Sequence, residues 1–321
     1  MIGISKLYCG MAAQSDALRY GHPAGPPSGS RPRRAAGKKP VVVWNCTRAC
    51  NLQCIHCYAH AGRQSAENEL SLAEGRALID DLVLAGVPVL LFSGGEPLCR
   101  ADLPELVAYA AGRGLRAVVS TNGTLIDDAM AARLKNAGLA YAGISLDGLR
   151  GTNDRFRGRP GAFDLALAGM RACRRAGLKV GLRFTLTRHN LADLPGVFDL
   201  IRAEDIPRAC FYHMVYSGRA ADLQGDDLSH AQARQALDLI MERTADLLEL
   251  GRPREILTVD NHCDGPYIHL RLRAAGRRED AARVLRLLAR AGGNSSGQGI
   301  GCVGWDGTVY PDQFLRNIPL G

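Results

Sequence analysis

The sequence alternates short apolar runs with helical stretches, and this repetition constrains the fold more than any other feature. Six such runs begin 24 to 48 residues apart and predict strands at residues 41–44, 89–92, 117–120, 141–146, 180–186 and 209–215. This spacing is close to the roughly 30 residues of a strand–helix–strand unit. Right-handed crossovers between nearly continuous apolar strands predict an α/β fold, a partial (β/α)6 TIM-like barrel with a small C-terminal appendage. A doubly wound open sheet is the structural alternative.

The helices between these strands carry defined ends. Ser71 and Glu74 have the spacing of a capping box at a helix N-terminus. A small residue, a glycine and an aliphatic residue recur at helix C-termini, with the glycine at positions 86, 138 and 177. Such a glycine adopts the left-handed conformation and is followed by a hydrophobic contact. We therefore expect each helix to end at its glycine and the chain to re-enter the core as a strand.

The pattern also predicts three successive parts. Residues 1–39 are rich in Gly, Pro, Ser and Arg and are expected to form a mobile N-terminal extension. Residues 40–225 are expected to form the barrel. Residues 226–321 are expected to form a helical and loop extension, with helices at 229–250 and 278–291 and loops at 258–267 and 294–312.

Composition limits the location and the partners. The chain has 321 residues and 46% hydrophobic residues, without an apolar run of the ~20 residues that a membrane helix needs. Its first residues lack the apolar stretch of a signal peptide, so we expect a cytoplasmic protein with no membrane partner. The net charge of +8 does not choose between nucleic acid, acidic lipid and a polyanionic small molecule. No basic strand is interleaved with aromatic residues, so we expect no nucleic-acid partner.

Three of the ten cysteines stand close together directly after the first predicted strand. Cys50, Cys54 and Cys57 have the spacing C-x3-C-x2-C. Three thiolates on one short loop suit a 4Fe-4S cluster with one iron that lacks a protein ligand, whereas structural zinc takes four ligands. Zinc with Cys46 or His56 as the fourth ligand, and unligated core thiols, are the alternatives. By strand alternation, Cys46 is expected to take part in barrel packing.

The cysteine spacing after the first strand of a six-fold βα pattern resembles the radical S-adenosylmethionine (SAM) enzymes. In that family the three cysteines bind a 4Fe-4S cluster and SAM chelates the fourth iron. The resemblance therefore implies metal ligands at Cys50, Cys54 and Cys57 and reductive cleavage of SAM to a 5′-deoxyadenosyl radical. It also implies an electron donor such as a ferredoxin or flavodoxin.

Further motifs at strand ends agree with this resemblance. Gly94, Gly95 and Glu96 belong to a segment similar to the family's GGEP motif, which contacts the methionine part of SAM. By the same resemblance, the ribose or the methionine carboxylate is approached by residues from the next three strands: Asn122, Ser145 and Arg183. Taken singly, these motifs are also typical of plain βα turns and helix caps.

Residues 152–163, 180–187, 216–219 and 292–297 are similar to the NirJ proteins of haem d1 biosynthesis and their relatives in the alternative haem pathway. This resemblance implies an iron tetrapyrrole substrate, didecarboxysirohaem in the NirJ case, and removal of propionate side chains. Such a substrate carries carboxylates, which guanidinium groups bind well. We expect the arginines at positions 150, 155, 157 and 159 to supply these guanidinium groups. The alternative is that they form a basic loop exposed to solvent. His213 and His262 are expected near the substrate iron or as structural histidines; no catalytic acid or base is assigned.

The tail departs from these relatives, which carry a cysteine-rich C-terminal segment for an auxiliary cluster. Only Cys263 and Cys302 lie in this tail, too few for four thiolates. We expect a truncated auxiliary-cluster region, so that a second cluster needs other ligands or does not form.

Two alternative functions stay open: another tetrapyrrole- or peptide-modifying radical SAM enzyme, or a non-catalytic tetrapyrrole- or metal-binding protein.

Overall fold

The structure is a computed structural model that describes residues 1–21 and 39–321, and its contacts divide the chain into two compact units. The cysteine unit comprises Lys39–Arg183, Val215–Gly225 and Ser295–Gly321. The terminal unit comprises Met1–Lys38, Phe184–Met214 and Asp226–Asn294. Both units are discontinuous in sequence, so these units differ from the three successive parts expected from composition.

The sheet of the cysteine unit is mainly parallel. Neighbouring strands pair in the order β6-β5-β4-β3-β2-β9, and β10 pairs antiparallel with β9. These strands are β2 (Val41–Thr47), β3 (Val89–Gly94), β4 (Arg116–Thr121), β5 (Tyr141–Ser145), β6 (Val180–Leu186), β9 (Ile300–Val303) and β10 (Val309–Tyr310). The first five predicted strands and the α/β class are confirmed.

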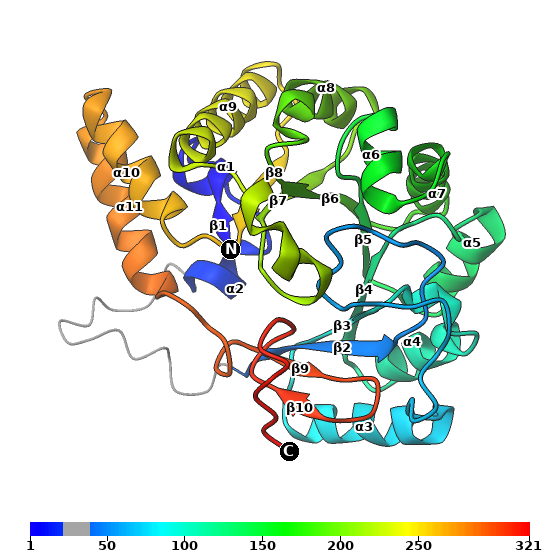
Figure 1. The fold of residues 1–321 in the computed structure, drawn as a ribbon. Coiled ribbons are helices and arrows are strands. Elements are labelled where there is room, and N and C mark those ends of the chain that lie inside the picture. Colours follow the sequence, from blue (N-terminus) through cyan, green and yellow to red (C-terminus); the bar gives the residue numbers. More distant parts are fainter. Residues whose placement is uncertain (22–38) are drawn as a thin grey trace. The chain divides into compact units, whose positions relative to one another are not determined.

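Helices connect the parallel strands of this unit, with α3 below β2 in Figure 1. They are α3 (Leu72–Leu84), η1 (Pro97–Cys99), α4 (Leu103–Gly112), α5 (Asp128–Asn136), α6 (Arg150–Arg157) and α7 (Ala162–Arg175). A further helical segment, η3 (Gly218–Asp226), follows β7 (Arg208–His213). Ser71 and Glu74 form the expected capping box, and Gly86, Gly138 and Gly177 have positive φ. Within residues 1–21 and 39–321, no helix is both long and apolar enough to cross a membrane.

The core of the cysteine unit lies around Trp44, directly before the loop that carries the cysteines. Trp44 and Phe92 are fully buried neighbours on β2 and β3, with ring centroids 5.7 Å apart. Helix α3 lies close to this pair, because a Cβ at Gly75 would be 2.8 Å from the Trp44 ring. Fully burying an aromatic side chain stabilises by about 1.5–3 kcal/mol. The strand that precedes the cysteines is therefore firmly anchored.

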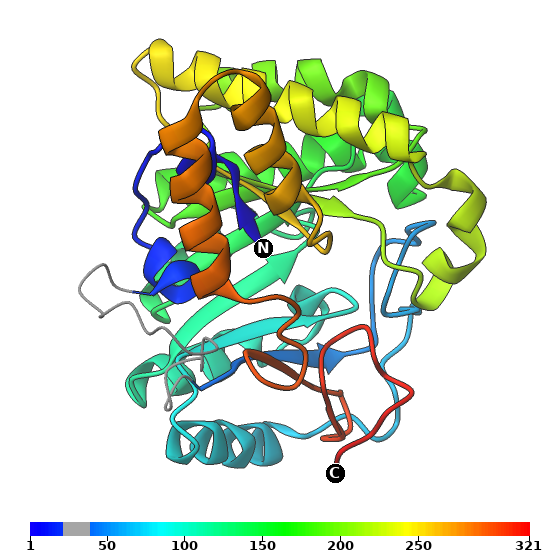
Figure 2. The same cartoon turned by 90° about the vertical axis from the view of Figure 1, so that its left-hand side faces the viewer.

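In the terminal unit, β7 pairs in parallel with β8, and β1 pairs antiparallel with β8. Helices α10 and α11 lie side by side in both views (Figures 1 and 2). The elements are β1 (Ile2–Gly3), α1 (Ile4–Leu7), α2 (Asp16–Tyr20), η2 (Leu191–Asp193), α8 (Leu194–Ala203), β7 (Arg208–His213), α9 (His230–Glu249), β8 (Glu255–Val259), α10 (Asp264–Ala274) and α11 (Arg278–Ala291). The sixth predicted strand and both predicted tail helices are confirmed.

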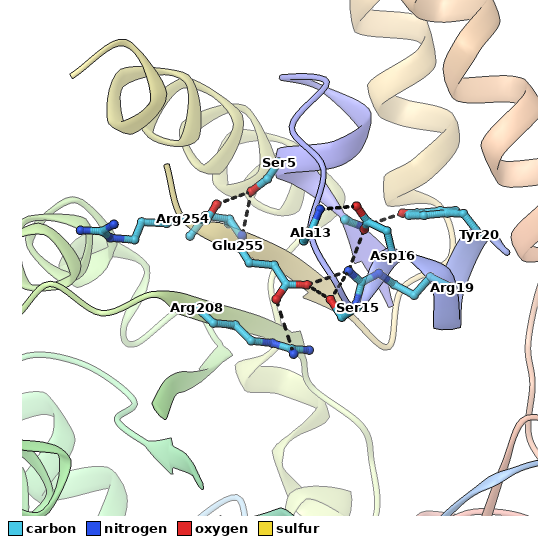
Figure 3. Close-up of polar contacts among 11 residues, drawn as sticks. Ser5, Ala13, Ser15, Asp16, Arg19, Tyr20, Arg208, Arg254 and Glu255 are labelled. Atoms are coloured by element: carbon cyan, nitrogen blue, oxygen red, sulfur yellow. Dashed lines mark hydrogen bonds and ion pairs between the residues drawn. The ribbon is translucent and has the colours of Figure 1, made fainter. Parts of the chain in front are cut away.

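The expected mobile extension is wrong for the first twenty residues. Ile4 and Leu7 are fully buried, although they are too few to give a periodic signal. The Glu255 carboxylate on β8 accepts hydrogen bonds from Ser15 and, at 2.7 Å, from Arg19 (Figure 3). This segment is therefore a folded part of the terminal unit. The rest of the expected extension, residues 22–38, lies outside the described residues.

The two expected loops of the tail are also wrong in part. Thr258 and Val259 end β8, and α10 begins at Asp264. Within the second expected loop, β9 adds to the free edge of β2, with Val43 opposite Cys302. Strands of two to five residues are too short to show an alternating pattern, so their neighbours in the fold determine them.

Candidate functional site

The loop between β2 and α3 brings the three motif cysteines together. Cys50 and Cys54 are buried with Leu52 and Ala61, and Cys57 packs against this group. Burial raises the pKa of Cys50 to about 12 and also raises the pKa of Cys54. Without a metal, these thiols therefore hold their protons strongly at neutral pH.

This arrangement suits one of the two metal alternatives better than the other. Among the described residues, no three His, Cys, Asp or Glu side chains surround one point closely enough to hold a single metal ion. A cubane cluster differs, because each of its cysteine ligands binds a separate iron and the sulfurs therefore lie further apart. Three soft thiols gathered in one group on this loop fit such a cluster.

Gly94 and Gly95 let the end of β3 lie directly on the start of the cysteine loop. A Cβ at Gly94 would be 2.4 Å from the Thr47 oxygen, and one at Gly95 would be 2.1 Å from the Ala49 oxygen. The Gly95 amide donates to the Thr47 carbonyl at 2.7 Å. In this structure the two glycines fit the close approach of two backbone segments, a role that the motif resemblance did not give them.

Glu96 is fully buried and joins the ends of β3 and β4. Its carboxylate accepts hydrogen bonds from the Thr121 hydroxyl at 2.6 Å, the Asn122 amide at 2.7 Å and the Leu98 amide at 3.1 Å. Burial raises the pKa of Glu96 in spite of these donors. The carboxylate thus positions the backbone at Asn122.

Asn122 in turn contacts the cysteine loop. Its Nδ2 donates to Oδ1 of Asn51 at 2.8 Å, and its Oδ1 accepts from the amide and the hydroxyl of Thr124. Asn51 lies between Cys50 and Cys54, and it donates back to Thr124 at 2.8 Å. The hydrogen-bonded chain Glu96–Asn122–Asn51 therefore links the end of β4 to the cysteine loop.

Tyr58, directly after the last motif cysteine, was not singled out from the sequence. Its hydroxyl lies 3.0 Å from Asn45 Oδ1 and 2.9 Å from Ser93 Oγ, at the ends of β2 and β3. Burial raises the pKa of Tyr58 to about 12, so the hydroxyl stays neutral and can donate. An aromatic residue after the third cysteine was the available signal.

Ser145, the last residue of β5, lies beside Arg183 in the middle of β6. They are in register, and both are half-buried. Arg183 lies over Gly143, where a Cβ would be 2.9 Å from Cδ of the arginine. Their proposed contact with SAM stays a prediction.

Two arginines from distant segments hold the carbonyl groups of the cysteine loop. Arg219 donates to the Cys54 oxygen at 2.8 Å and to the Ala61 oxygen at 2.9 Å, and Arg316 donates to the Ala59 oxygen at 3.2 Å. Gly218 approaches so closely that a Cβ would be 2.4 Å from the Cys57 oxygen. Residues 216–219 were singled out only by their similarity to relatives, and these contacts were not predicted because they join segments more than 150 residues apart.

The four arginines expected to bind carboxylates do not act as one group. Arg157 is buried and forms an ion pair with Asp147, so the expectation that it binds substrate is wrong. Arg150 pairs with Asp164 at the surface, and Arg155 is exposed. Arg155 and Arg157 are two positions apart on helix α6 and therefore face different directions, and Arg159 lies beyond the end of this helix.

Arg159 lines a cavity of about 380 Å³ beside the cysteine loop, together with Cys50, Gln53 and Arg63. Both guanidinium groups suit a carboxylate. Among the residues that line this cavity there is no acidic side chain.

The remaining candidates lie elsewhere. His213 ends β7, with Nε2 3.0 Å from Oδ2 of Asp264, as a structural histidine would be. His262 and Cys263 are exposed. Cys302 is buried in β9, where it packs in the sheet. Cys46 is fully buried, and its thiol donates to the Ser93 oxygen, in line with the expected packing role.

Comparisons with known proteins place this geometry in a family. A sequence profile of the Radical SAM superfamily matches residues 44–201. An Fe-coproporphyrin III synthase of Methanosarcina barkeri is 58% identical over 321 residues, which cover all of this chain and 80% of that protein. A pre-heme d1 synthase of Dinoroseobacter shibae is 40% identical over 292 residues, 90% of this chain and 72% of that protein. The crystal structure of Streptococcus suis SuiB bound to the precursor peptide SuiA covers 88% of this chain and 62% of that chain, with a TM-score of 0.70 and 15% identity.

The chain belongs to the radical SAM superfamily, and the structural likeness confirms the partial-barrel fold. Within the superfamily, it is a member of the haem-synthesis family that contains Fe-coproporphyrin III synthase and pre-heme d1 synthase. This membership implies a 4Fe-4S cluster and SAM.

Proposed function

We propose that this chain is a radical SAM enzyme that modifies the side chains of an iron tetrapyrrole, with its cluster held by Cys50, Cys54 and Cys57. The observation that carries the proposal is that Cys50 and Cys54 lie in one buried group, against which the partly buried Cys57 packs. Soft sulfur donors suit iron. When bound, the cluster and SAM supply a 5′-deoxyadenosyl radical, which removes hydrogen from the substrate.

The residues of the chain orient and enclose this chemistry. Glu96, Asn122 and Asn51 hold the loop from one direction, and Tyr58 holds it at the ends of β2 and β3. We further propose that Gly94, Gly95, Glu96 and Asn122 border the SAM site, and that their polar groups bind other parts of the protein rather than SAM. Ser145, at the end of β5, and Arg183, beside it in β6, are the proposed polar contacts for SAM.

The proposed product is Fe-coproporphyrin III, because the relative of that name is 58% identical over the whole chain. Removal of propionate side chains from didecarboxysirohaem in haem d1 synthesis is the second candidate, supported by the pre-heme d1 synthase at 40% identity. The cavity with Arg63 and Arg159 supports a substrate with carboxylates, since two guanidinium groups line it without an acidic neighbour.

Cluster binding and SAM cleavage are tested first. Anaerobic reconstitution is expected to give about four irons per chain with a 4Fe-4S spectrum. Reduction in the presence of SAM is expected to release 5′-deoxyadenosine, and Cys50→Ala, Cys54→Ala and Cys57→Ala should each abolish that release. Cys263→Ala, an exposed cysteine in the terminal unit, is the matched control and should retain it. Release of 5′-deoxyadenosine by all three loop variants would refute the proposal.

The substrate is tested by mass spectrometry of the product formed from didecarboxysirohaem under the same conditions. Fe-coproporphyrin III supports the first candidate, and a product that has lost propionate side chains supports the second. Tight tetrapyrrole binding without 5′-deoxyadenosine would instead show a non-catalytic binding protein. Cleavage of SAM with no change in any tetrapyrrole would favour a peptide-modifying enzyme.

A further inference from the structure

A buried charge network lies directly against the cysteine loop and has no role in the function proposed above. Asp147, after the end of β5, is 1% exposed. Its carboxylate forms an ion pair with Arg157 and lies 3.0 Å from Nε2 of His56. Nη1 of Arg157 lies 3.5 Å from Sγ of Cys54. The guanidinium group therefore lies between a carboxylate and a motif thiol.

The backbone fixes this position. The end of α6 is attached to the cysteine loop, because the Ile55 amide donates to the Phe156 oxygen at 3.0 Å and the Gln53 amide donates to the Arg157 oxygen at 3.3 Å. Gly158 follows with a φ of +64°, and a Cβ there would be 2.7 Å from the Gln53 oxygen. Arg157 can therefore not move away from the loop without breaking these contacts.

Asp147 is fixed just as firmly. Its amide donates to Oδ1 of Asn153 at 2.9 Å, and Asn153 is fully buried in α6. The carboxylate therefore meets Arg157 in a predetermined place. An ion pair built this way resists rearrangement when a neighbouring charge changes.

Arg157 keeps its charge in these surroundings. Its guanidinium group does not lose its proton in proteins, and it is held in an ion pair with the buried Asp147 carboxylate. A guanidinium group next to a thiolate acts as a charge-assisted hydrogen-bond donor. Hydrogen bonds to the sulfurs and the local charge set the reduction potential of an iron–sulfur cluster.

We propose that Arg157 is a positioning residue that raises the reduction potential of the cluster through Cys54, and that Asp147 limits this effect. The proposal rests on the proposed function, in which Cys54 is a cluster ligand. Reduction adds one electron to the cluster and makes it more negative. A fixed positive charge at Cys54 stabilises that reduced state, whereas the nearby carboxylate destabilises it.

The test compares four variants of the reconstituted full chain by redox titration followed by electron paramagnetic resonance. Arg157→Gln is expected to raise the oxidised-to-reduced ratio about tenfold at the wild-type midpoint, a downward shift of about 59 mV for one electron. Asp147→Asn is expected to shift the midpoint upward, and Arg157→Lys to stay close to wild type. Arg155→Gln is the matched control, because this exposed arginine lies on the same helix; it should leave the midpoint unchanged.

Two results overturn the proposal: a wild-type midpoint in an Arg157→Gln protein that holds a full cluster, or a midpoint in Asp147→Asn that is unchanged or lowered. If Arg157→Gln holds less iron than wild type, the midpoint of Asp147→Asn decides by the criterion given for it. A wild-type chain that binds no cluster refutes the proposed function instead, so the two failures are distinguishable.

Discussion

Replacement of Gly95 by alanine tests the idea that the end of β3 supports the cysteine loop. The added Cβ would lie 2.1 Å from the Ala49 oxygen and 2.7 Å from both the Ala49 carbon and the Arg48 oxygen. All three atoms belong to the backbone, so no side-chain rotation relieves the overlap. Ordinary contact begins at about 3.4 Å, which requires the two segments to separate by more than an ångström.

The cost follows from what that separation breaks. The Gly95 amide donates to the Thr47 oxygen and the Glu96 amide to the Ala49 oxygen, each at 2.7 Å. A buried group that loses its partner costs about 1–3 kcal/mol, and overpacking alone typically costs about 1–3 kcal/mol. We therefore expect Gly95→Ala to reduce the free energy of unfolding by about 3 kcal/mol or more and to prevent cluster assembly.

The assay is urea unfolding of the metal-free protein, together with the iron content after reconstitution. Gly151→Ala is the control: no atom lies within 4 Å of its added Cβ, and the residue is in helix α6, so its stability should stay within about 1 kcal/mol of wild type. A Gly95→Ala protein with wild-type stability and a full cluster would refute the reasoning.

Two further predictions concern the same strand ends. Tyr58→Phe leaves Asn45 and Ser93 without their shared hydroxyl, so the free energy of unfolding of the metal-free protein should fall by about 1–3 kcal/mol in urea titration; a change below about 0.5 kcal/mol would contradict this. Burial raises the pKa of Cys46 from about 9 to about 12, because the folded state favours the neutral thiol. This contribution to the free energy of unfolding is complete below pH 9 and is lost as the pH rises towards 12. Between pH 8 and pH 10, wild type should therefore lose about 1.4 kcal/mol more stability than Cys46→Ala, and equal losses would disprove the shift.

The sequence was sufficient to predict what depends on local pattern. Strands such as Val89–Gly94 are continuous apolar runs, and the helices between them end at glycines whose positive φ was expected. The cysteine spacing likewise identified one loop, because all three side chains belong to it. In each case the determining residues lie within a few positions of one another.

What could not be predicted depends on partners far away in the sequence. Arg157 was expected to face a substrate, but Asp147 and Cys54 determine where its charge lies. Gly94 and Gly95 also lie against the backbone at the start of the cysteine loop, a contact that the motif resemblance did not predict. The short strands β8 and β9 have too few residues for an alternating pattern, and pairing with β7 and β2 defines them.

The pairing of β2 with β9 has a consequence for the order of events during synthesis. Val41 lies opposite Ile300, so the strand that leads into the cysteines gains its second neighbour only after about 260 further residues have left the ribosome. Contacts of such long sequence separation form late, since a large loop must close before they are made. During translation, the strand that leads into the proposed cluster site would still lack this neighbour. Insertion of the proposed cluster is therefore expected to follow translation rather than accompany it.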